Sequence, residues 1–383
     1  MRILARICFD FIGKVGKKAF GLESTHNHKA NNNNNNKQIR NTYENNLIMT
    51  SGGKTILGMG NPLLDISAVV PESLLSKYGI SLNNAILAEE KHLPLYDEMV
   101  AEHDVEYIAG GATQNSMRVA QWMLQREGAT AFSGSVSNDK YGDKLYAVAS
   151  AAGVNVQYYR TDEAATGTCA VCINGGERSL VANLAAANCY KHSHTESDTM
   201  TSLIHSSDIF YISGFFLSVP EGPKSMVHIG EHASTSNKIF CMNLSAPFLI
   251  QFFSEQMNSV LPYTDFIFAN ETEAETWGKA NGMEGAKLED VALKLSSLPK
   301  KSGSRCRTVV FTQGADPTIV AQNGKVSTYA VPKLNKELLI DTNGAGDAFV
   351  GGFLARLADG KCFRFFFNDI LKPCTLTFFF CRR

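Results

Sequence analysis

A glycine-rich string near the carboxyl end carries the strongest chemical signal of the chain. It reads Asp-Thr-Asn-Gly-Ala-Gly-Asp at 341–347, and it precedes residues 348–357, whose apolar members recur at helical spacing. The first amides of a helix lack partners within it and lie at the positive end of its dipole. Because the two glycines have no side chains, an anion can approach these amides closely. We expect an anion hole at Asn343, Gly344, Ala345 and Gly346.

Asp347 falls in the first turn of the expected helix, beside this anion hole. Main-chain amides suit the charge that develops on a transferring phosphoryl group. A carboxylate at this place can accept the proton of an attacking hydroxyl, and general base catalysis typically contributes about 10²–10⁴-fold. The alternative is that Asp347 only caps the helix. The string therefore indicates phosphoryl transfer, with Asp347 as the candidate base.

A second segment resembles a phosphate-binding motif, but its surroundings do not fit that motif. Residues 52–55 resemble the end of a P-loop, but Ile48 stands where that motif requires its first glycine. The segment also precedes an expected strand, whereas a P-loop follows one. The glycine fingerprint of dinucleotide-binding folds is absent from the sequence.

Two polar clusters could hold a hydroxylated substrate. Asn61 and Asp65 follow an expected strand, where a carboxylate can accept two hydrogen bonds from a cis-diol such as that of ribose. A turn stabilised by these two side chains is an equal alternative. The second cluster contains Gly110 and Gly111, which let the backbone approach a ligand closely, followed by Asn115. Its alternative is a simple helix start.

That second cluster also contains a candidate helix cap. Thr113 can cap the helix that follows, and Asn115 would then lie in the first turn of that helix.

A parallel sheet would position all of these groups. The chain has 383 residues, enough for one large α/β domain or two ordinary ones. From Ile56 onward, short apolar runs alternate with segments of helical spacing, which indicates parallel strands covered on both faces. We predict an α/β fold with a doubly wound, mostly parallel sheet flanked by helices. The expected strands lie at 55–60, 129–136, 208–212, 239–244, 265–269 and 308–312.

Several segments do not show this alternation of strand and helix patterns. Residues near 62–108 and 164–187 show alternation and turn residues, so we expect them to form a small β lid. Residues 1–48 include six consecutive asparagines and cannot bury enough apolar surface to offset ordering entropy. We expect a disordered extension there, a folded domain over 49–360, and a divergent aromatic-rich tail over 361–383.

The charge and the apolar content of the sequence limit the classes of partner that we expect. The net charge of −1 gives no global field that would attract nucleic acid, and no apolar run is long enough to span a bilayer. We expect neither nucleic acid nor a membrane as a partner, and we expect a monomer. Cys169 and Cys172 resemble half of a zinc site, but no second pair lies at the right spacing, so a structural role is favoured.

Cysteine usage bears on the compartment. Nine cysteines, an odd number, are scattered without a framework, which favours a reduced, intracellular protein. We expect the cytoplasm, with the nucleus as an alternative. A mitochondrial presequence is disfavoured by Asp10 and by the few serines among the first twenty residues.

From about Met49 to Gly360 the chain resembles the ribokinase-like carbohydrate and nucleoside kinases, and among them the adenosine kinases. The string at 341–347 is similar to the second signature of that family, in which the last Asp is the catalytic base. Longer strings carry the narrower resemblance to the adenosine kinases. They lie at 60–67, 110–116, 166–170, 178–188, 243–248 and 270–274.

The resemblance implies an enzyme that moves the γ-phosphate of ATP onto the 5′-hydroxyl of adenosine, giving AMP and ADP for purine salvage. Arg178 would reach the phosphates from the lid, since a guanidinium is planar and always charged. Asn270 and Glu273 match a motif that organises Mg²⁺ and its waters. Thr312 and Gly314 match the nucleotide-side loop. The nucleoside would be held by Asn61, Asp65, Gly110, Gly111 and Asn115.

The sequence also departs from the family pattern. Ala112 and Ala85 stand where adenosine kinases usually have Ser and Gln, which could weaken contacts with the nucleoside. After Gly360 the resemblance ends, where the family continues with a helix over the adenine side of the ATP site. Because lost burial costs about 25 cal/mol per Å², we expect this chain to be unstable or to bind ATP poorly.

Two alternatives to the adenosine kinase hypothesis remain open at this point. A sugar kinase of the same fold would phosphorylate a substrate such as ribose. An impaired relative would bind the nucleoside without turnover. The intact string at 341–347 argues against lost chemistry, and the divergent tail argues for it.

Overall fold

The computed structural model describes residues 53–82, 85–175, 177–301, 305–331 and 344–360. The chain divides into two compact units, Met1–Ser51 and Gly52–Arg383, and all described residues belong to the second. The expected disordered extension and aromatic-rich tail therefore lie outside the described residues.

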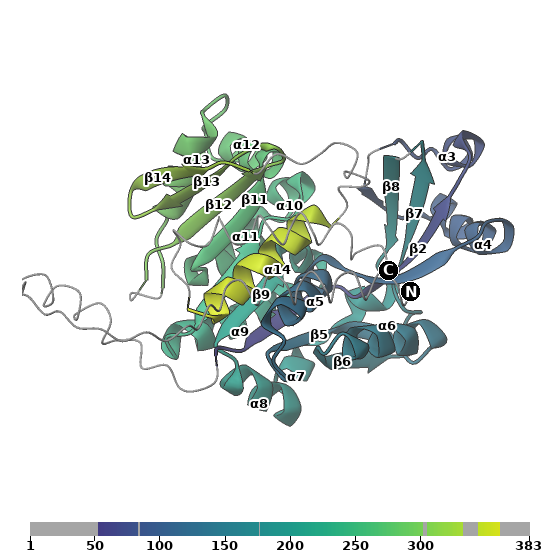
Figure 1. The fold of residues 1–383 in the computed structure, drawn as a ribbon, viewed down its shortest axis with the longest axis horizontal. Helices are drawn as coiled ribbons and strands as arrows, with labels where there is room; N and C mark the ends of the chain where they lie inside the picture. The colour runs from purple at the N-terminus through teal and green to yellow at the C-terminus, as the bar shows by residue number, and fades with distance from the viewer. Residues whose placement is uncertain (1–52, 83–84, 176, 302–304, 332–343, 361–383) are drawn as a thin grey trace, which may run out of the picture. The chain divides into compact units, whose positions relative to one another are not determined.

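The strands of the described residues alternate with helices along most of the chain (Figure 1). The strands are β1 (Ile56–Met59), β2 (Leu63–Val69), β3 (Ala85–Leu87), β4 (Glu106–Gly110), β5 (Thr130–Ser137), β6 (Asn155–Thr161), β7 (Thr168–Asn174), β8 (Glu177–Asn183), β9 (Ile209–Ser213), β10 (Ile239–Asn243), β11 (Phe266–Asn270), β12 (Thr308–Gln313), β13 (Asp316–Gln322) and β14 (Lys325–Tyr329). The α-helices are α3 (Glu72–Tyr78), α4 (Leu93–Glu102), α5 (Ala112–Leu124), α6 (Lys140–Ala151), α7 (His192–Thr195), α8 (Asp198–Ser206), α9 (Gly222–Thr235), α10 (Pro247–Phe252), α11 (Ser254–Val260), α12 (Glu271–Ala280), α13 (Leu288–Ser296) and α14 (Ala345–Ala358). Short 3-10 helices are η1 (Glu90–His92), η2 (Ala185–Cys189), η3 (Gly214–Ser218) and η4 (Leu261–Tyr263).

The main sheet has nine strands in the order β14-β13-β12-β11-β10-β9-β1-β5-β6. Pairing is parallel from β12 through to β6, and β13 and β14 add two antiparallel strands at one edge. Successive residues of a strand face opposite sides, and separate apolar clusters cover the two sides. In β9, Phe210 and Ile212 belong to one cluster, whereas Ile209 and Tyr211 belong to the other. The prediction of a doubly wound, mostly parallel sheet is confirmed.

A second sheet has five strands in the order β3-β8-β7-β2-β4. These strands come from the two segments in which the sequence pattern changes, between residues 63 and 110 and between 168 and 183. Leucines of α3 and α4 share an apolar cluster with Ile66 of β2 and Val181 of β8 and so cover one face of this sheet. Cys169 and Cys172 are buried thiols on β7. A role of this sheet as a lid stays a prediction.

Helices α5 and α14 lie side by side on one face of the main sheet (Figure 1). A Cβ atom placed on Gly351 would lie 2.6 Å from the carbonyl oxygen of Ser116, so glycine lets the two helices approach closely. The Ser116 hydroxyl in turn donates to the carbonyl oxygen of Asp347 at 3.0 Å. These contacts bring together the first turns of two helices that are far apart in sequence.

The start of α5 differs from the prediction. Gly111, with φ of 95°, is the N-cap residue, and no side chain caps this helix. Thr113 lies inside the first turn, and its hydroxyl accepts the Ser213 amide across 3.2 Å. The predicted cap at Thr113 is therefore wrong, because the hydroxyl bridges to the end of β9 instead.

Among the described residues, no helix is both long and apolar enough to cross a membrane.

Candidate active site

The central contact of the site joins α5 to α14. The Asn115 amide donates to the Asp347 carboxylate, with 3.0 Å between Nδ2 and Oδ2. Burial raises the pKa of Asp347 from its usual value to about 6, and the Asn115 hydrogen bond opposes that rise. A carboxyl group with a pKa near neutrality is better suited to take a proton than an ordinary aspartate.

Asp65 lies close enough to Asp347 for the two charges to interact. Burial, and then the Asp347 charge, raise the pKa of Asp65 to about 7, whereas Arg178 and Arg118 lower it. A Cβ atom on Gly110 would lie 2.3 Å from the Asp65 carboxylate, so only glycine leaves room for this side chain. The structure thus brings together two carboxylates and two guanidinium groups from separate parts of the sequence.

Asn61 is buried, and neither atom of its amide group has a hydrogen-bond partner among the described residues. Its backbone carbonyl would lie 2.3 Å from a Cβ atom on Gly111, which ties the end of β1 to the start of α5. A buried amide without a partner is costly unless another group satisfies it. Asn61 is therefore suited to bind a polar ligand.

The turn before α14 provides main-chain donors. Gly344 adopts a left-handed conformation with φ of 72° and is the N-cap residue, with no side-chain cap. Its carbonyl accepts the first helical bond from Ala348 at 2.8 Å. The amides of Ala345 and Gly346 come before the first helical hydrogen bond, so they have no acceptor within the helix. The space beside Gly346 is open, since a Cβ atom there would meet nothing within 4 Å. Asn343, also predicted for this hole, lies outside the described residues.

The nucleotide-side residues lie where two neighbouring strands end. Asn270 and Thr312 are register partners at the ends of β11 and β12, and Gly314 follows with φ of 56°. Asn270 and Glu273 form a capping box, in which the Glu273 amide donates to Asn270 Oδ1 at 2.8 Å and the Asn270 amide donates to Glu273 Oε2 at 3.1 Å. Carboxyl ends of parallel strands share one edge of a sheet.

The Glu273 carboxyl is a candidate for organising a cation. Burial raises its pKa to about 7, and backbone hydrogen bonds from Asn270 and Ser245 oppose that rise. An ionised carboxylate can accept about four hydrogen bonds, so the two backbone bonds leave room for a cation-bound water. Oxygen donors of this kind fit Mg²⁺, which usually keeps several waters.

Sequence reasoning missed two residues of the site. Arg118 donates to the Ala109 carbonyl at 2.9 Å and acts on Asp65 by its charge. Tyr211 is buried on β9, and its hydrogen bonds with Ser116 and Asn243 partly oppose the rise in its pKa that burial causes. The spacing of Asn115 and Arg118, three residues apart on one helix face, could have indicated Arg118. Tyr211 reads as an ordinary core residue.

Comparison with known proteins identifies the family of the chain. Residues 72–364 match the pfkB family of carbohydrate kinases, and the chain belongs to that family. Several of the relatives that it matches are adenosine kinases. The chain is 58% identical to adenosine kinase 2 of Arabidopsis thaliana over 306 residues, which are 80% of this chain and 88% of that protein. It is 46% identical to adenosine kinase of Dictyostelium discoideum, over 80% of this chain and 89% of that protein.

Solved structures give the same result. The fold matches Anopheles gambiae adenosine kinase in complex with P1,P4-di(adenosine-5) tetraphosphate with a TM-score of 0.78 and 44% identity, covering 84% of this chain and 94% of that one. It matches Schistosoma mansoni adenosine kinase in complex with adenosine with a TM-score of 0.79 and 32% identity, covering 85% and 95%. The predicted ribokinase-like fold and the resemblance to adenosine kinases are confirmed.

Proposed function

We propose that this chain transfers the γ-phosphoryl group of ATP to the 5′-hydroxyl of adenosine, giving AMP and ADP for purine salvage. The observation that carries the proposal is the Asn115–Asp347 hydrogen bond. It fixes a carboxyl group with a raised pKa between the Asp65 cluster and the amides that begin α14. The adenosine kinases among its relatives support adenosine as the substrate.

The ribose is held by groups around the end of β1 and the start of α5. Asp65 accepts hydrogen bonds from the two ribose hydroxyls, and the unpartnered amide of Asn61 completes the polar contacts. Gly110 and Gly111 leave the space that these contacts need. Asn115 contacts both the nucleoside and Asp347, so substrate binding and the base share one residue.

Asp347 takes the proton of the 5′-hydroxyl as that oxygen attacks the γ-phosphorus. General base catalysis of this kind accounts for roughly 3–5 kcal/mol of barrier. The amides of Gly344, Ala345 and Gly346, with Asn343, donate to the phosphoryl oxygens as their charge develops. The amides of Ala345 and Gly346 are fixed by α14 before the reaction, so they need no reorganisation during it.

ATP lies along the strand ends that carry Asn270, Thr312 and Gly314. Asn270 and Glu273 would hold Mg²⁺ through its waters, and that ion would neutralise phosphate charge. Arg178 binds the phosphates from the five-stranded sheet, which closes over the nucleoside and limits ATP hydrolysis by water. We propose that the enzyme acts as a monomer in the cytoplasm, without nucleic acid or membrane partners.

The test is phosphate transfer from γ-labelled ATP to adenosine or to ribose by the purified chain. Labelled AMP in large excess over labelled ribose phosphate is expected. Preference for ribose would instead favour the sugar kinase. A chain that binds adenosine at equilibrium and makes no product would favour the impaired relative. The Asp347→Ala variant serves as the background, since it keeps the binding residues and lacks the base.

A further inference from the structure

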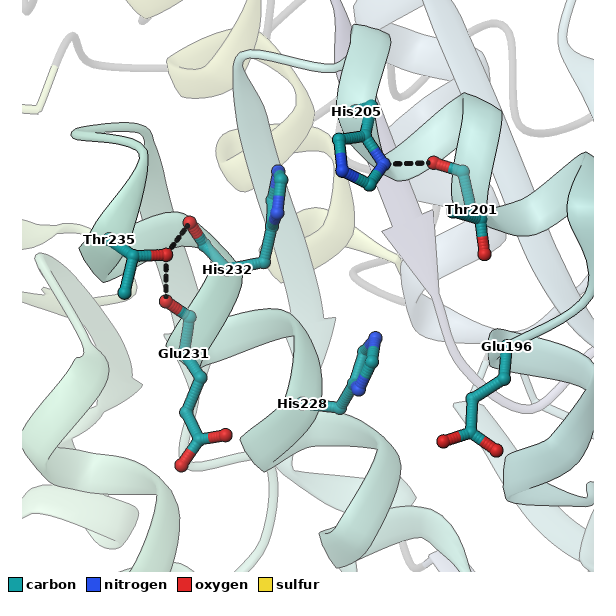
Figure 2. Close-up of a pocket in the computed structure, with 7 residues that line it drawn as sticks. All are labelled: Glu196, Thr201, His205, His228, Glu231, His232 and Thr235. Atoms are coloured by element: carbon teal, nitrogen blue, oxygen red, sulfur yellow. Dashed lines mark hydrogen bonds between the residues drawn. The ribbon is translucent and has the colours of Figure 1, made fainter.

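A histidine-rich groove lies apart from the candidate active site, between the segment that ends α7 and the helices α8 and α9. Its cavity has a volume of about 330 Å³. Figure 2 shows imidazole and carboxylate side chains from both sides pointing into it. The lining residues are Glu196, Thr201, His205, His228, Glu231, His232 and Thr235.

Three side chains at this groove bring metal-binding atoms together. One ligand atom from each of His192, Glu196 and His228 lies within 4.8 Å of the others. His192 Nε2 is 3.4 Å from Glu196 Oε1, and the rings of His192 and His228 have centroids 5.5 Å apart. Ligand atoms that share a tetrahedral zinc ion with bonds of about 2.0–2.2 Å lie roughly 3–3.5 Å apart. The first two atoms are already at that spacing.

The contacts of Ser225 favour the His192 tautomer whose proton is on Nδ1, the ring nitrogen away from Glu196. The Ser225 hydroxyl donates to the Glu221 carbonyl at 2.9 Å. Its oxygen is also 3.2 Å from His192 Nδ1, and it accepts from that nitrogen in the tautomer whose ring proton is on Nδ1. A metal-binding histidine commonly donates its other ring N–H to a protein group in this way.

Two acceptors therefore face each other across 3.4 Å. With its proton on Nδ1, His192 presents the lone pair of Nε2 to the Glu196 carboxylate, which is also an acceptor. Either a proton or a metal ion between the two atoms satisfies such a pair. A metal ion satisfies both atoms without a protonated ring.

The surroundings support this arrangement. His192 is held in place by its backbone amide, which donates to Glu221 Oε2 at 2.8 Å. The carboxylates of Glu196 and Glu221 and the ammonium of Lys224 all lie close enough to His192 to act on it by charge. His232, one turn after His228 on α9, adds a ring nitrogen, Nε2, that is buried and has no hydrogen-bond partner within the described part of the chain.

We propose that His192, Glu196 and His228 bind a divalent transition-metal ion of the zinc class, with a further coordination position open to the groove. Two imidazoles and one carboxylate are ligands that Zn²⁺ accepts, and imidazole favours such metals over Mg²⁺. The site has no residue in common with the candidate active site, so it is independent of the magnesium proposed there.

The experiment titrates the chelator-treated full-length chain with Zn²⁺ by calorimetry, and with Co²⁺ by visible absorption. One saturable ion per chain is expected, with a rise in Tm on binding. His228→Ala should abolish the saturable phase. Ser225→Ala keeps all three ligands but loses the group that orients His192, and it should weaken binding by about 10–100-fold. His103→Ala, which removes a histidine outside the groove, should bind as the original chain does.

Binding that His228→Ala and Glu196→Gln leave unchanged would overturn the proposal, as would the lack of a saturable phase in the original chain. Glu196 has a side chain that is 56% exposed, so Glu196→Gln tests the site even where a histidine substitution disturbs folding. A Co²⁺ absorption spectrum typical of thiolate ligands would show that cysteines bind the ion, and it would also contradict the proposed site at the groove.

Discussion

At the scale of single residues, Asp347 and Asp65 are buried carboxyl groups close enough for charge on Asp347 to act on Asp65. Each pKa is raised mainly by burial, and the charge of Asp347 adds to the rise at Asp65. Protons shared by interacting groups leave in macroscopic steps that belong to the pair. Both carboxyls must be ionised for the proposed roles, one to bind the diol and the other to take a proton.

We predict that kcat for adenosine rises with pH through an apparent pKa of about 6, because Asp347 must be ionised to act as a base. In Asn115→Leu the ascending limb should move to higher pH, since the hydrogen bond that lowers the pKa of Asp347 is lost. Steady-state rates from pH 5 to 9 at saturating substrate measure this. An unchanged limb in the variant would argue that another group titrates.

We predict that Gly110→Ala lowers kcat/KM for adenosine by about 10²-fold, the size of effect that a displacement of about 1 Å can cause. The new methyl group would lie 2.3 Å from the Asp65 carboxylate and must displace it. The KM for ATP should stay within about twofold of the original, because the proposed contacts of ATP lie at other strand ends. A twofold change corresponds to less free energy than the ~1 kcal/mol of a lost hydrogen bond. Equal losses for both substrates would contradict a specific role of Asp65.

Sequence reasoning located the polar residues of the site but not all of their interactions. Asn61, Asp65 and Asn115 stand out because polar residues beside glycines at strand ends are unusual in a buried sheet. Their partners depend on a contact across 232 positions of sequence, from Asn115 to Asp347, which no local pattern contains. Tyr211 was missed for the same reason, because its hydroxyl is satisfied only after folding.

At the scale of elements, the contact between α5 and α14 decides the geometry of the site. Ser116 holds the backbone of Asp347 while its neighbour Asn115 holds the carboxylate, so one helix turn orients both. Gly351 permits the close approach one turn further along α14. Displacement of either helix would therefore separate the base from the residues that bind the nucleoside.

Two glycine substitutions on α14 should separate folding from chemistry. Gly351→Ala places a methyl group 2.6 Å from the Ser116 carbonyl, and such overpacking costs about 1–3 kcal/mol. We expect a lower Tm and a lower kcat. Gly346→Ala meets nothing within 4 Å, so its Tm should be unchanged, whereas kcat should fall by about 10²-fold if phosphoryl oxygens approach that amide.

Thermal melts and initial rates of the two variants, measured together, make this comparison. Full activity of Gly346→Ala would remove the start of α14 from the proposed anion hole.

At the scale of the whole molecule, the main sheet could be predicted and the second sheet only in outline. Apolar runs such as 308–312 lie in strands covered on both faces, and this burial can be inferred from the short stretch of sequence itself. The pairing of β2 with β4 and β7 depends on which edges meet in space, and alternation alone leaves this open. The antiparallel β13 and β14 also escaped prediction, because β13 has only a short buried apolar run, Ile319–Ala321, and β14 is mostly exposed.

The two raised carboxyl pKa values also set how stability depends on pH. Native Asp347 keeps its proton up to about pH 6, whereas an unfolded aspartate loses it near its ordinary value of 3.8. Between these values the native state binds more protons, so the free energy of unfolding falls as pH rises. This contribution to stability is fully present below about pH 4 and is lost above the native pKa.

Asp347→Asn should therefore be more stable than the original chain at pH 8 and nearly equal to it at pH 4. The substituted amide can still accept the Asn115 hydrogen bond, and removing the negative charge also lets the pKa of Asp65 fall. A gain in Tm at pH 8 is expected, since about 1 kcal/mol shifts Tm by roughly 2–4 °C in a chain of about 150–250 residues and by less in a longer chain such as this one. Calorimetric melts at the two pH values test this, and a variant that is less stable at pH 8 would show that the buried charge of Asp347 is compensated by the fold.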